Sequence, residues 1–147
     1  MVIGINEYTN EEYKSLIGAV PDADAMSGFL IDVLRANPKR ITNLRDGDAT
    51  RSAIIKELEA LRHNPEIQPN DPIIIYFAGH GARNDRPEGW TRESNDGEVE
   101  VLCPVDIGEE DPKDITQKVP GIPDYTIMVL LDLLSGLKGN NIVSLDF

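Results

Sequence analysis

Residue types that build metal sites and disulfides are almost missing from this sequence. Its 147 residues include one cysteine, Cys103, and two histidines, so the chain can form no internal disulfide. Zinc sites of the usual kind need more Cys and His ligands than this, and no HExxH motif is present. A single cysteine is typical of proteins from a reducing compartment, so we expect a cytoplasmic protein.

Basic side chains and long apolar runs are also scarce. The 14 Lys and Arg residues are outnumbered by 26 Asp and Glu residues, which gives a formal net charge of -12 at pH 7. Such a surface repels phosphate backbones, so we expect no nucleic-acid partner. No stretch approaches the roughly 20 apolar residues of a membrane span. The N-terminus also lacks the basic start and apolar region of a signal peptide, so we expect no membrane partner.

What the chain does contain is an alternation of apolar runs and amphipathic segments. Three apolar runs predict buried strands, and the middle one lacks the polar alternation of a solvent-facing strand, so we expect it to be covered on both faces. These runs are VIGIN (2–6), PIIIYFA (72–78) and NIVSLDF (141–147). A shorter strand followed by a polar turn is predicted within RITNLRDGDAT (40–50).

Three amphipathic helices are predicted between these strands. The first begins near Asp22 and is closed by Asn37-Pro38. The second follows an N-cap at Thr50 and ends near Asn64-Pro65, and Gly136 and Gly139 suit the end of the third. Their apolar faces are, in chain order, Met26, Phe29, Leu30, Val33 and Leu34; Ile54, Ile55, Leu58 and Leu61; and Ile127, Leu130, Leu131 and Leu134.

Residues 82–121 interrupt this alternation. They are rich in charge, Gly and Pro, and only EVEVLCPVD (98–106) has strand character, so we expect a long loop that carries a small hairpin. The predicted order is β-α-β-α-β, the long loop, α and β. Strands that alternate with helices predict a single α/β domain whose parallel sheet is covered by helices on both faces.

His80 is the first candidate for chemistry. It lies in YFAGHG (76–81) directly after a predicted parallel strand, and functional groups of such sheets gather at the carboxyl ends of the strands. The flanking Gly79 and Gly81 remove side-chain bulk and permit unusual backbone angles. An imidazole there could transfer protons near neutral pH, whereas the plainer alternative is a surface histidine in a glycine turn. His63 fits the end of an amphipathic helix instead.

A histidine base needs a nucleophile, and the sequence offers poor candidates. A serine nucleophile on an α/β-hydrolase fold requires a GxSxG elbow, and the nearest pattern, LLSGLKG (133–139), lies in a predicted helix. Cys103 has no helix N-terminus or basic neighbour that would lower its pKa, so a packed residue is favoured. The acidic segments 93–101 and 105–114 could bind Ca²⁺, although solvated loops are the favoured interpretation.

In chain order, these segments resemble the caspase-like cysteine peptidases (peptidase C14), most of all the metacaspases and fungal caspase-domain proteins. VIGINEY (2–8) resembles the first strand of that family, and LIGAVPDADAMSGFL (16–30) resembles the next loop and helix. DPIIIYFAGHGAR (71–83) resembles the strand that bears the catalytic His-Gly pair. The resemblance extends over nearly the whole chain, and YFAGHG is its most specific part.

The resemblance implies a caspase-like three-layer α/β/α fold with a mostly parallel central sheet, and it implies a role for each site residue. His80 would accept the thiol proton and protonate the leaving amine. The Gly81 N–H would help to form the oxyanion hole. Asp22 and Asp146 would line the pocket for the residue before the cut, where two carboxylates favour Arg or Lys.

The chain also departs from the family pattern. Family members continue from the last strand into a D-x-C-H-S-G-like segment, whereas this chain reads LDF (145–147) and stops. We therefore expect residues 1–147 to be the large-subunit-like portion of the domain, with its C-terminal strands missing. Without the nucleophilic cysteine we expect no hydrolysis by the family mechanism. Ala19 and Pro21 also stand where the metacaspase pattern commonly has Cys and Asn.

The expected partner is a polypeptide substrate or a caspase-like chain, and no cofactor is expected. The alternative is a non-catalytic pseudoenzyme of the same fold that acts as an interaction module, because an unpaired sheet edge recruits partners. A flavodoxin-like ligand binder is a weaker alternative, because no phosphate-binding Gly-rich loop follows any strand.

Overall fold

A parallel four-stranded sheet forms the middle layer of the domain. The computed structural model describes residues 1–85 and 98–146. Within them, the strand order is β2 (Asn43–Arg45), β1 (Val2–Gly4), β3 (Ile73–Ala78) and β9 (Ile142–Asp146), and every neighbouring pair is parallel. The four strands correspond to the four predicted from the sequence. The expected burial of the last one was wrong for Val143, which is 50% exposed on the edge strand β9 of the described sheet.

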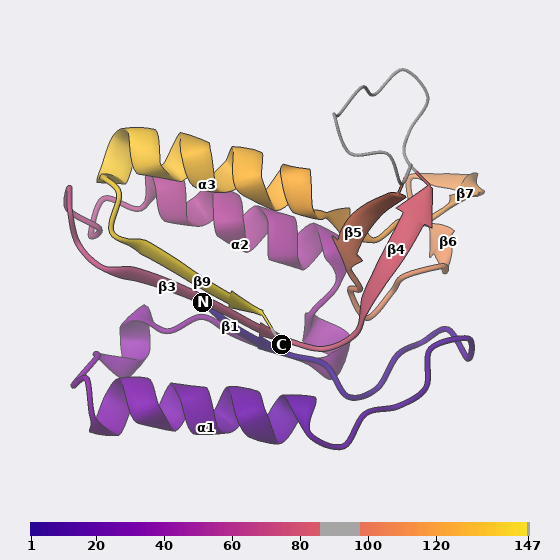
Figure 1. The fold of residues 1–147 in the computed structure, drawn as a ribbon, viewed down its shortest axis with the longest axis horizontal. Coiled ribbons are helices and arrows are strands. Elements are labelled where there is room, and N and C mark those ends of the chain that lie inside the picture. The colour runs from indigo at the N-terminus through magenta and orange to yellow at the C-terminus, as the bar shows by residue number, and fades with distance from the viewer. Residues whose placement is uncertain (86–97, 147) are drawn as a thin grey trace.

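Helices cover both faces of this sheet. Helix α1 (Ala19–Asp32) lies on one face, whereas α2 (Arg51–His63) and α3 (Asp124–Lys138) lie side by side on the other (Figure 1). The order of the elements along the chain and the three layers confirm the predicted α/β class. None of the helices in the described part of the chain is long and apolar enough to cross a membrane.

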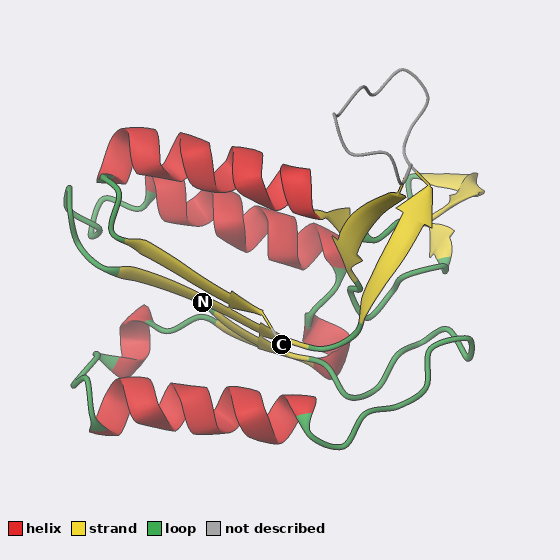
Figure 2. Ribbon diagram, in the orientation of Figure 1, coloured by secondary structure: helices red, strands yellow, loops and turns green. Residues whose placement is uncertain are grey.

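A small antiparallel sheet stands at one end of the domain, beside the start of α3 (Figure 2). It consists of β4 (Gly81–Asp85), β5 (Glu98–Leu102) and β8 (Ile122–Pro123). A separate hairpin pairs β6 (Glu110–Asp111) with β7 (Asp114–Lys118). The expected strand within residues 98–106 is present as β5, but the region contains more strand pairing than the long loop with a small hairpin that we expected. Every residue of β7 is exposed, so a polar strand of this kind has no apolar periodicity that a sequence reading could detect.

The core is divided by the sheet into two clusters. Alternate side chains of β3 point to opposite faces: Ile75 and Phe77 pack with α2 and α3, whereas Tyr76 and Ala78 pack with α1. This burial on both faces explains the unbroken apolar run of the strand.

Helix α1 differs from its prediction in both its bounds and its buried face. It packs on the sheet through Ala19 and Ala23, which approach Gly4 so closely that a Cβ at Gly4 would lie 2.6 Å from the Ala23 Cβ. Small residues therefore face the sheet, and this contact rotates much of the predicted apolar face outward. Phe29 and Val33 are 46% and 61% exposed, so their predicted burial was wrong.

The other two helices match their predictions. The Thr50 hydroxyl accepts a hydrogen bond from the Ala53 N–H at 3.2 Å, which confirms the N-cap of α2. His63 is the last residue of α2, as expected. Leu134 of α3 is fully buried, and Gly139 closes that helix with a φ of +87°.

Candidate active site

The carboxyl ends of β1, β2 and β3 meet at one edge of the sheet, where several loops are tied together. The Asp46 carboxylate, just after β2, accepts the backbone N–H groups of Asn6 and Glu7 at 2.7 and 3.0 Å. The Asn6 side chain in turn accepts the Val20 N–H in the first turn of α1 at 3.1 Å. These bonds hold the loop after β1 in a fixed position beside the end of β3.

His80 lies at this edge, and its imidazole is oriented by a main-chain carbonyl. The ring Nε2 lies 2.7 Å from the Lys14 oxygen. Because a carbonyl oxygen can only accept a hydrogen bond, Nε2 carries the proton in this contact. In the neutral imidazole the lone pair is then on Nδ1, which is the nitrogen able to accept a proton.

Two tyrosines enclose His80. The backbone N–H of His80 donates to the Tyr8 hydroxyl at 2.7 Å, and the Tyr8 and His80 rings have centroids 5.0 Å apart. Tyr13 stacks on Tyr8 at 5.7 Å and lies 6.2 Å from the His80 ring. The imidazole is therefore part of an ordered cluster, which does not fit a histidine in a free surface turn.

Gly79 and Gly81, which flank His80, differ in the space that surrounds them. Neither has a positive φ, so the backbone freedom that glycine permits is not used at these two positions. A Cβ at Gly79 would lie 2.9 Å from both the Phe77 ring and the Tyr8 hydroxyl, so that position has no room for a side chain. A Cβ at Gly81 would have the Val101 oxygen as its nearest atom, at 3.8 Å, which is an ordinary van der Waals contact.

The N–H group of Gly81 faces away from the neighbouring strand β5. The Cys103 N–H donates to the His80 oxygen at 2.9 Å, and the next pair in the ladder is Gly81 with Leu102. Hydrogen-bonded and non-hydrogen-bonded pairs alternate in antiparallel sheets. Gly81 therefore belongs to a pair of the second kind, and its N–H points to the open side of β4.

Cys103 is a buried, unactivated thiol. It is 0% exposed, and burial raises its pKa from 9.0 to about 11. This confirms the prediction of a packed residue. Ser135, the other nucleophile considered, lies inside α3 and donates to the Asp132 carbonyl at 2.9 Å.

The two predicted substrate-binding residues, Asp22 and Asp146, belong to elements that flank β3, namely α1 and β9. Asp22 is exposed in the first turn of α1 and lines an open hollow of about 440 Å³ together with Met26, Phe29 and Tyr76. Burial, and to a lesser extent the Asp22 charge, raise the pKa of Tyr76. The backbone of Asp146 in β9 is in register with Phe77, the next residue of β3.

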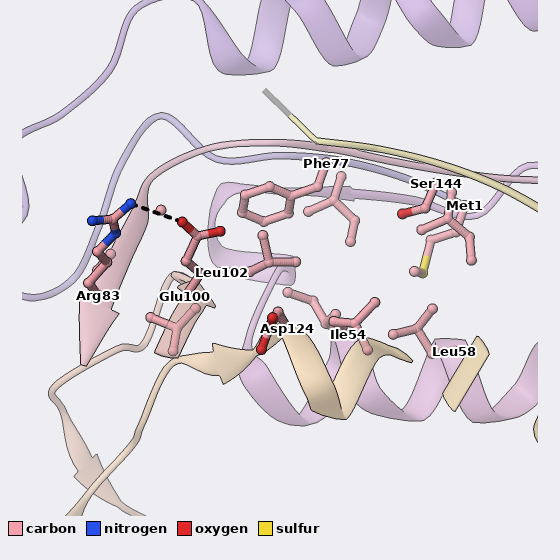
Figure 3. A pocket seen from close by; sticks show the side chains of 15 residues that line it. Met1, Ile54, Leu58, Phe77, Arg83, Glu100, Leu102, Asp124 and Ser144 are labelled. Carbon is pink, nitrogen blue, oxygen red and sulfur yellow. Dashed lines mark hydrogen bonds and ion pairs between the residues drawn. The ribbon is translucent and has the colours of Figure 1, made fainter. Parts of the chain in front are cut away.

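A larger cavity of about 510 Å³ lies on the opposite side of the sheet, between β3, α2 and α3 (Figure 3). Ile3, Ile54 and Phe77 line it and are themselves buried in the core. The ion pair of Arg83 with Glu100, at 3.2 Å, stands at one end, and both side chains are mostly exposed. Gly81 is among the residues that line this cavity, whereas His80 and Cys103 are not.

No group of three or more His, Cys, Asp and Glu side chains is arranged to hold a metal ion within residues 1–85 and 98–146. The acidic segment 93–101, considered for Ca²⁺, falls partly outside the described residues.

Three residues of this site were missed by the sequence reasoning: Tyr8, Lys14 and Asp46. Lys14 contributes a main-chain oxygen, so its side-chain type carries no signal. Tyr8 and Asp46 contact positions 72 and 40 residues away in the sequence. Only their place in the loops at the carboxyl edge of the sheet could have suggested them.

The fold itself is shared with a solved structure. A crystal structure of a protein from Geobacter sulfurreducens matches 99% of this chain with a TM-score of 0.68, at 18% sequence identity. The chain covers 47% of that protein. The comparison places the chain among proteins with this three-layer α/β/α architecture.

Sequence comparisons identify the family. Residues 1–119 match the family described as "Metacaspase, peptidase C14 domain". Metacaspase-1B of Aspergillus clavatus is 30% identical over 110 residues, and Metacaspase-1 of Pyricularia oryzae is 29% identical over 113 residues. These alignments include 72% and 73% of this chain. The chain therefore belongs to the metacaspase family of caspase-like peptidases, which confirms the resemblance seen in the sequence.

The alignments include only part of those relatives. They span 26% of the Aspergillus clavatus protein and 27% of the Pyricularia oryzae protein. Metacaspase-1 of Saccharomyces cerevisiae gives a similar result, with 27% identity over 118 residues that make up 26% of its length.

Proposed function

We propose that this chain carries the general-base portion of a caspase-like cysteine endopeptidase site that acts on polypeptides. The observation that carries the proposal is the bond between His80 Nε2 and the Lys14 carbonyl, which leaves Nδ1 as the proton acceptor. His80 takes the proton of the attacking thiol and returns it to the leaving amine. Gly81, whose N–H points away from β5, donates to the oxyanion of the tetrahedral intermediate.

The attacking thiol is not among residues 1–147 in this proposal. Cys103 is the single cysteine of the sequence, and it is buried with a raised pKa. A thiol that stays protonated and out of reach of a peptide bond cannot act as a nucleophile. We therefore expect the 147-residue chain by itself to lack peptidase activity.

For specificity, we propose that Asp22 and Asp146 accept an Arg or Lys side chain of the substrate. The position of Asp22 supports its part, because it lines an open hollow beside Tyr76 near the carboxyl end of β3. The backbone of Asp146 lies on the neighbouring strand, in register with Phe77. The net charge of -12 adds a general attraction for basic peptides. The scarcity of cysteine supports a cytoplasmic location, which cell fractionation would test.

The first test uses the purified chain with fluorogenic peptides that end in Arg or Lys. We expect cleavage at the rate of the blank. Robust turnover that disappears in both His80→Ala and Cys103→Ala would contradict the proposal and identify Cys103 as a nucleophile.

The second test supplies the missing group. The chain is combined with the cysteine-bearing C-terminal segment of a fungal metacaspase relative, and complex formation is checked by size-exclusion chromatography. We expect cleavage after Arg that falls by roughly three orders of magnitude in His80→Ala. His63→Ala is the matched control, because His63 is the only other histidine and should leave the rate unchanged. A complex that cleaves equally well with His80→Ala would refute the role of His80.

The same complex tests the specificity. Asp22→Asn should lower kcat/KM for Arg peptides by about tenfold, because an attractive carboxylate is lost. Asp32→Asn, an exposed carboxylate at the other end of α1, should have no effect.

A non-catalytic interaction module is the second candidate function. It is favoured by the apolar side chains exposed on α3 and on the edge strand β9 of the described sheet, among them Leu133, Leu137 and Val143, which are 44%, 55% and 50% exposed. Light scattering tests it directly. A monomer that binds no metacaspase-like chain would count against this function.

A further inference from the structure

We propose that Tyr8 is the positioning residue of His80, and that Gly79 is a glycine in order to leave room for the Tyr8 hydroxyl. This inference rests on the proposed role of His80 as the general base. It assigns a function to the first glycine of the AGHG segment (78–81) and to a loop residue that is distant in sequence.

Tyr8 contacts both the backbone and the ring of His80. Its hydroxyl accepts the His80 N–H at 2.7 Å, and this bond fixes the chain where it leaves β3. Its ring lies against the imidazole, with centroids 5.0 Å apart and an interplanar angle of 45°. The Lys14 carbonyl holds Nε2 on the same imidazole. The backbone of His80, the face of its ring and its Nε2 nitrogen are thus all restrained by one loop, residues 5–18.

Tyr8 is itself held in place. The neighbouring Thr9 donates to the Val105 carbonyl through both its N–H, at 3.1 Å, and its hydroxyl, at 2.9 Å. Two residues before Tyr8, the Asn6 N–H donates a hydrogen bond to the Asp46 carboxylate. Burial raises the pKa of Tyr8 to about 12, so the group that meets His80 is a neutral phenol. A support of this kind keeps a catalytic side chain within the narrow range of productive geometries.

Gly79 makes this contact possible. Its φ is not positive, so conformational freedom does not explain the glycine. A Cβ at this position would lie 2.9 Å from the Tyr8 hydroxyl and 2.9 Å from the Phe77 ring. Phe77 is buried in the core and has little room to move, so the tyrosine in its surface loop would be displaced instead. Gly79→Ala should therefore break the hydrogen bond between the His80 N–H and the Tyr8 hydroxyl by displacing the hydroxyl, whereas Tyr8→Phe breaks it by removing the hydroxyl.

The alternative is that Tyr8 only packs the loop, in which case its loss would lower stability without changing His80. The imidazole nitrogens separate the two cases. With only two histidines in the sequence, long-range ¹H–¹⁵N spectra of the 147-residue chain at pH 8 contain two imidazole patterns. His80→Gln identifies which pattern is which, and the exposed His63 is an internal reference for an unrestrained ring. Exchange of the His80 amide hydrogen reports on the bond to Tyr8.

In the wild-type chain we expect His80 to show the Nε2-protonated tautomer. In Tyr8→Phe and in Gly79→Ala, the pattern should shift toward that of His63, and exchange of the His80 amide should accelerate by roughly tenfold. The double variant should exchange no faster than either single variant, because both changes remove one interaction. Tyr13→Phe is the matched control: it keeps a ring in the same cluster, and we expect it to leave the His80 pattern unchanged.

An unchanged His80 pattern and amide in a folded Tyr8→Phe chain would overturn the inference, as would an equal effect of Tyr13→Phe. Additive effects in the double variant would overturn the role given to Gly79. Should Tyr8→Phe fail to fold, Gly79→Ala decides, because it retains the tyrosine ring. The spectra need no turnover, so their result is separate from the cleavage tests of the proposed function.

Discussion

The burial of Cys103 leads to a quantitative prediction about its reactivity. A thiol of pKa 9.0 is about one-tenth thiolate at pH 8, whereas a thiol of pKa about 11 is roughly one-thousandth thiolate. Since the thiolate is the reactive species, the pKa alone should slow alkylation of native Cys103 by about a hundredfold. Complete burial should slow it further, because the reagent must wait for the structure to open.

The assay follows iodoacetamide labelling of the chain by intact mass at pH 8. A short unstructured peptide with one cysteine gives the reference rate, and the chain in 6 M urea shows that Cys103 itself is competent once exposed. We expect native labelling to be at least about a hundred times slower than in either reference. Labelling of the native chain at the rate of the free peptide would refute the reasoning and reopen Cys103 as a nucleophile.

The same shift links stability to pH. Between pH 9 and pH 11 an unfolded thiol loses its proton while the folded thiol keeps it, so unfolding releases a proton and becomes easier as the pH rises. The free energy of unfolding should fall by on the order of 2 kcal/mol across this range from Cys103 alone. Urea unfolding of Cys103→Ala supplies the comparison, since its stability should decline less over the same interval. Parallel curves for the two chains would contradict the raised pKa.

Two further predictions concern the frame that supports the site, and urea unfolding checks both. Gly4→Ala should destabilise the chain by about 1–3 kcal/mol, because its Cβ would meet Ala23 at 2.6 Å. Gly28 lies in α1, the helix that contains Ala23, and a Cβ at Gly28 would meet no atom within 4 Å. Gly28→Ala should therefore stabilise the chain by roughly 0.5–1 kcal/mol. Equal effects of Gly4→Ala and Gly28→Ala would contradict the close packing of α1 on β1. Asp46→Ala should cost roughly 2–4 kcal/mol, because two N–H groups lose a charged acceptor. Asp48→Ala, an exposed carboxylate of the same turn, should be nearly neutral, and a comparable loss there would show that the loop bonds of Asp46 are unimportant.

Local residue patterns were sufficient for most of the fold. The run PIIIYFA predicted a strand buried on both faces, since burial on two sides permits no polar alternation. Thr50 predicted the start of α2, because its hydroxyl satisfies a backbone donor within three residues. Signals of this kind arise within a few residues of sequence, and the position of His80 after β3 followed from them.

Contacts between distant segments were not predictable in the same way. The sequence placed the apolar face of the first helix on residues such as Phe29 and Val33, which are 46% and 61% exposed, whereas Ala19 and Ala23 pack against Gly4. The polar strand β7 left no periodic signal, because its pairing with β6 buries none of its residues.

The sequence alone therefore determined the α/β class, the resemblance to metacaspases and the choice of His80, because each depends on residue types in local order. Only the tertiary structure decided which imidazole nitrogen meets the Lys14 carbonyl, how little space surrounds Gly79 and how deeply the Cys103 thiol is buried. The Lys14 carbonyl, the Tyr8 hydroxyl and the burial of the thiol act across loops that are far apart in the chain. Such contacts depend on where the backbone folds back on itself, and no single stretch of residues encodes them.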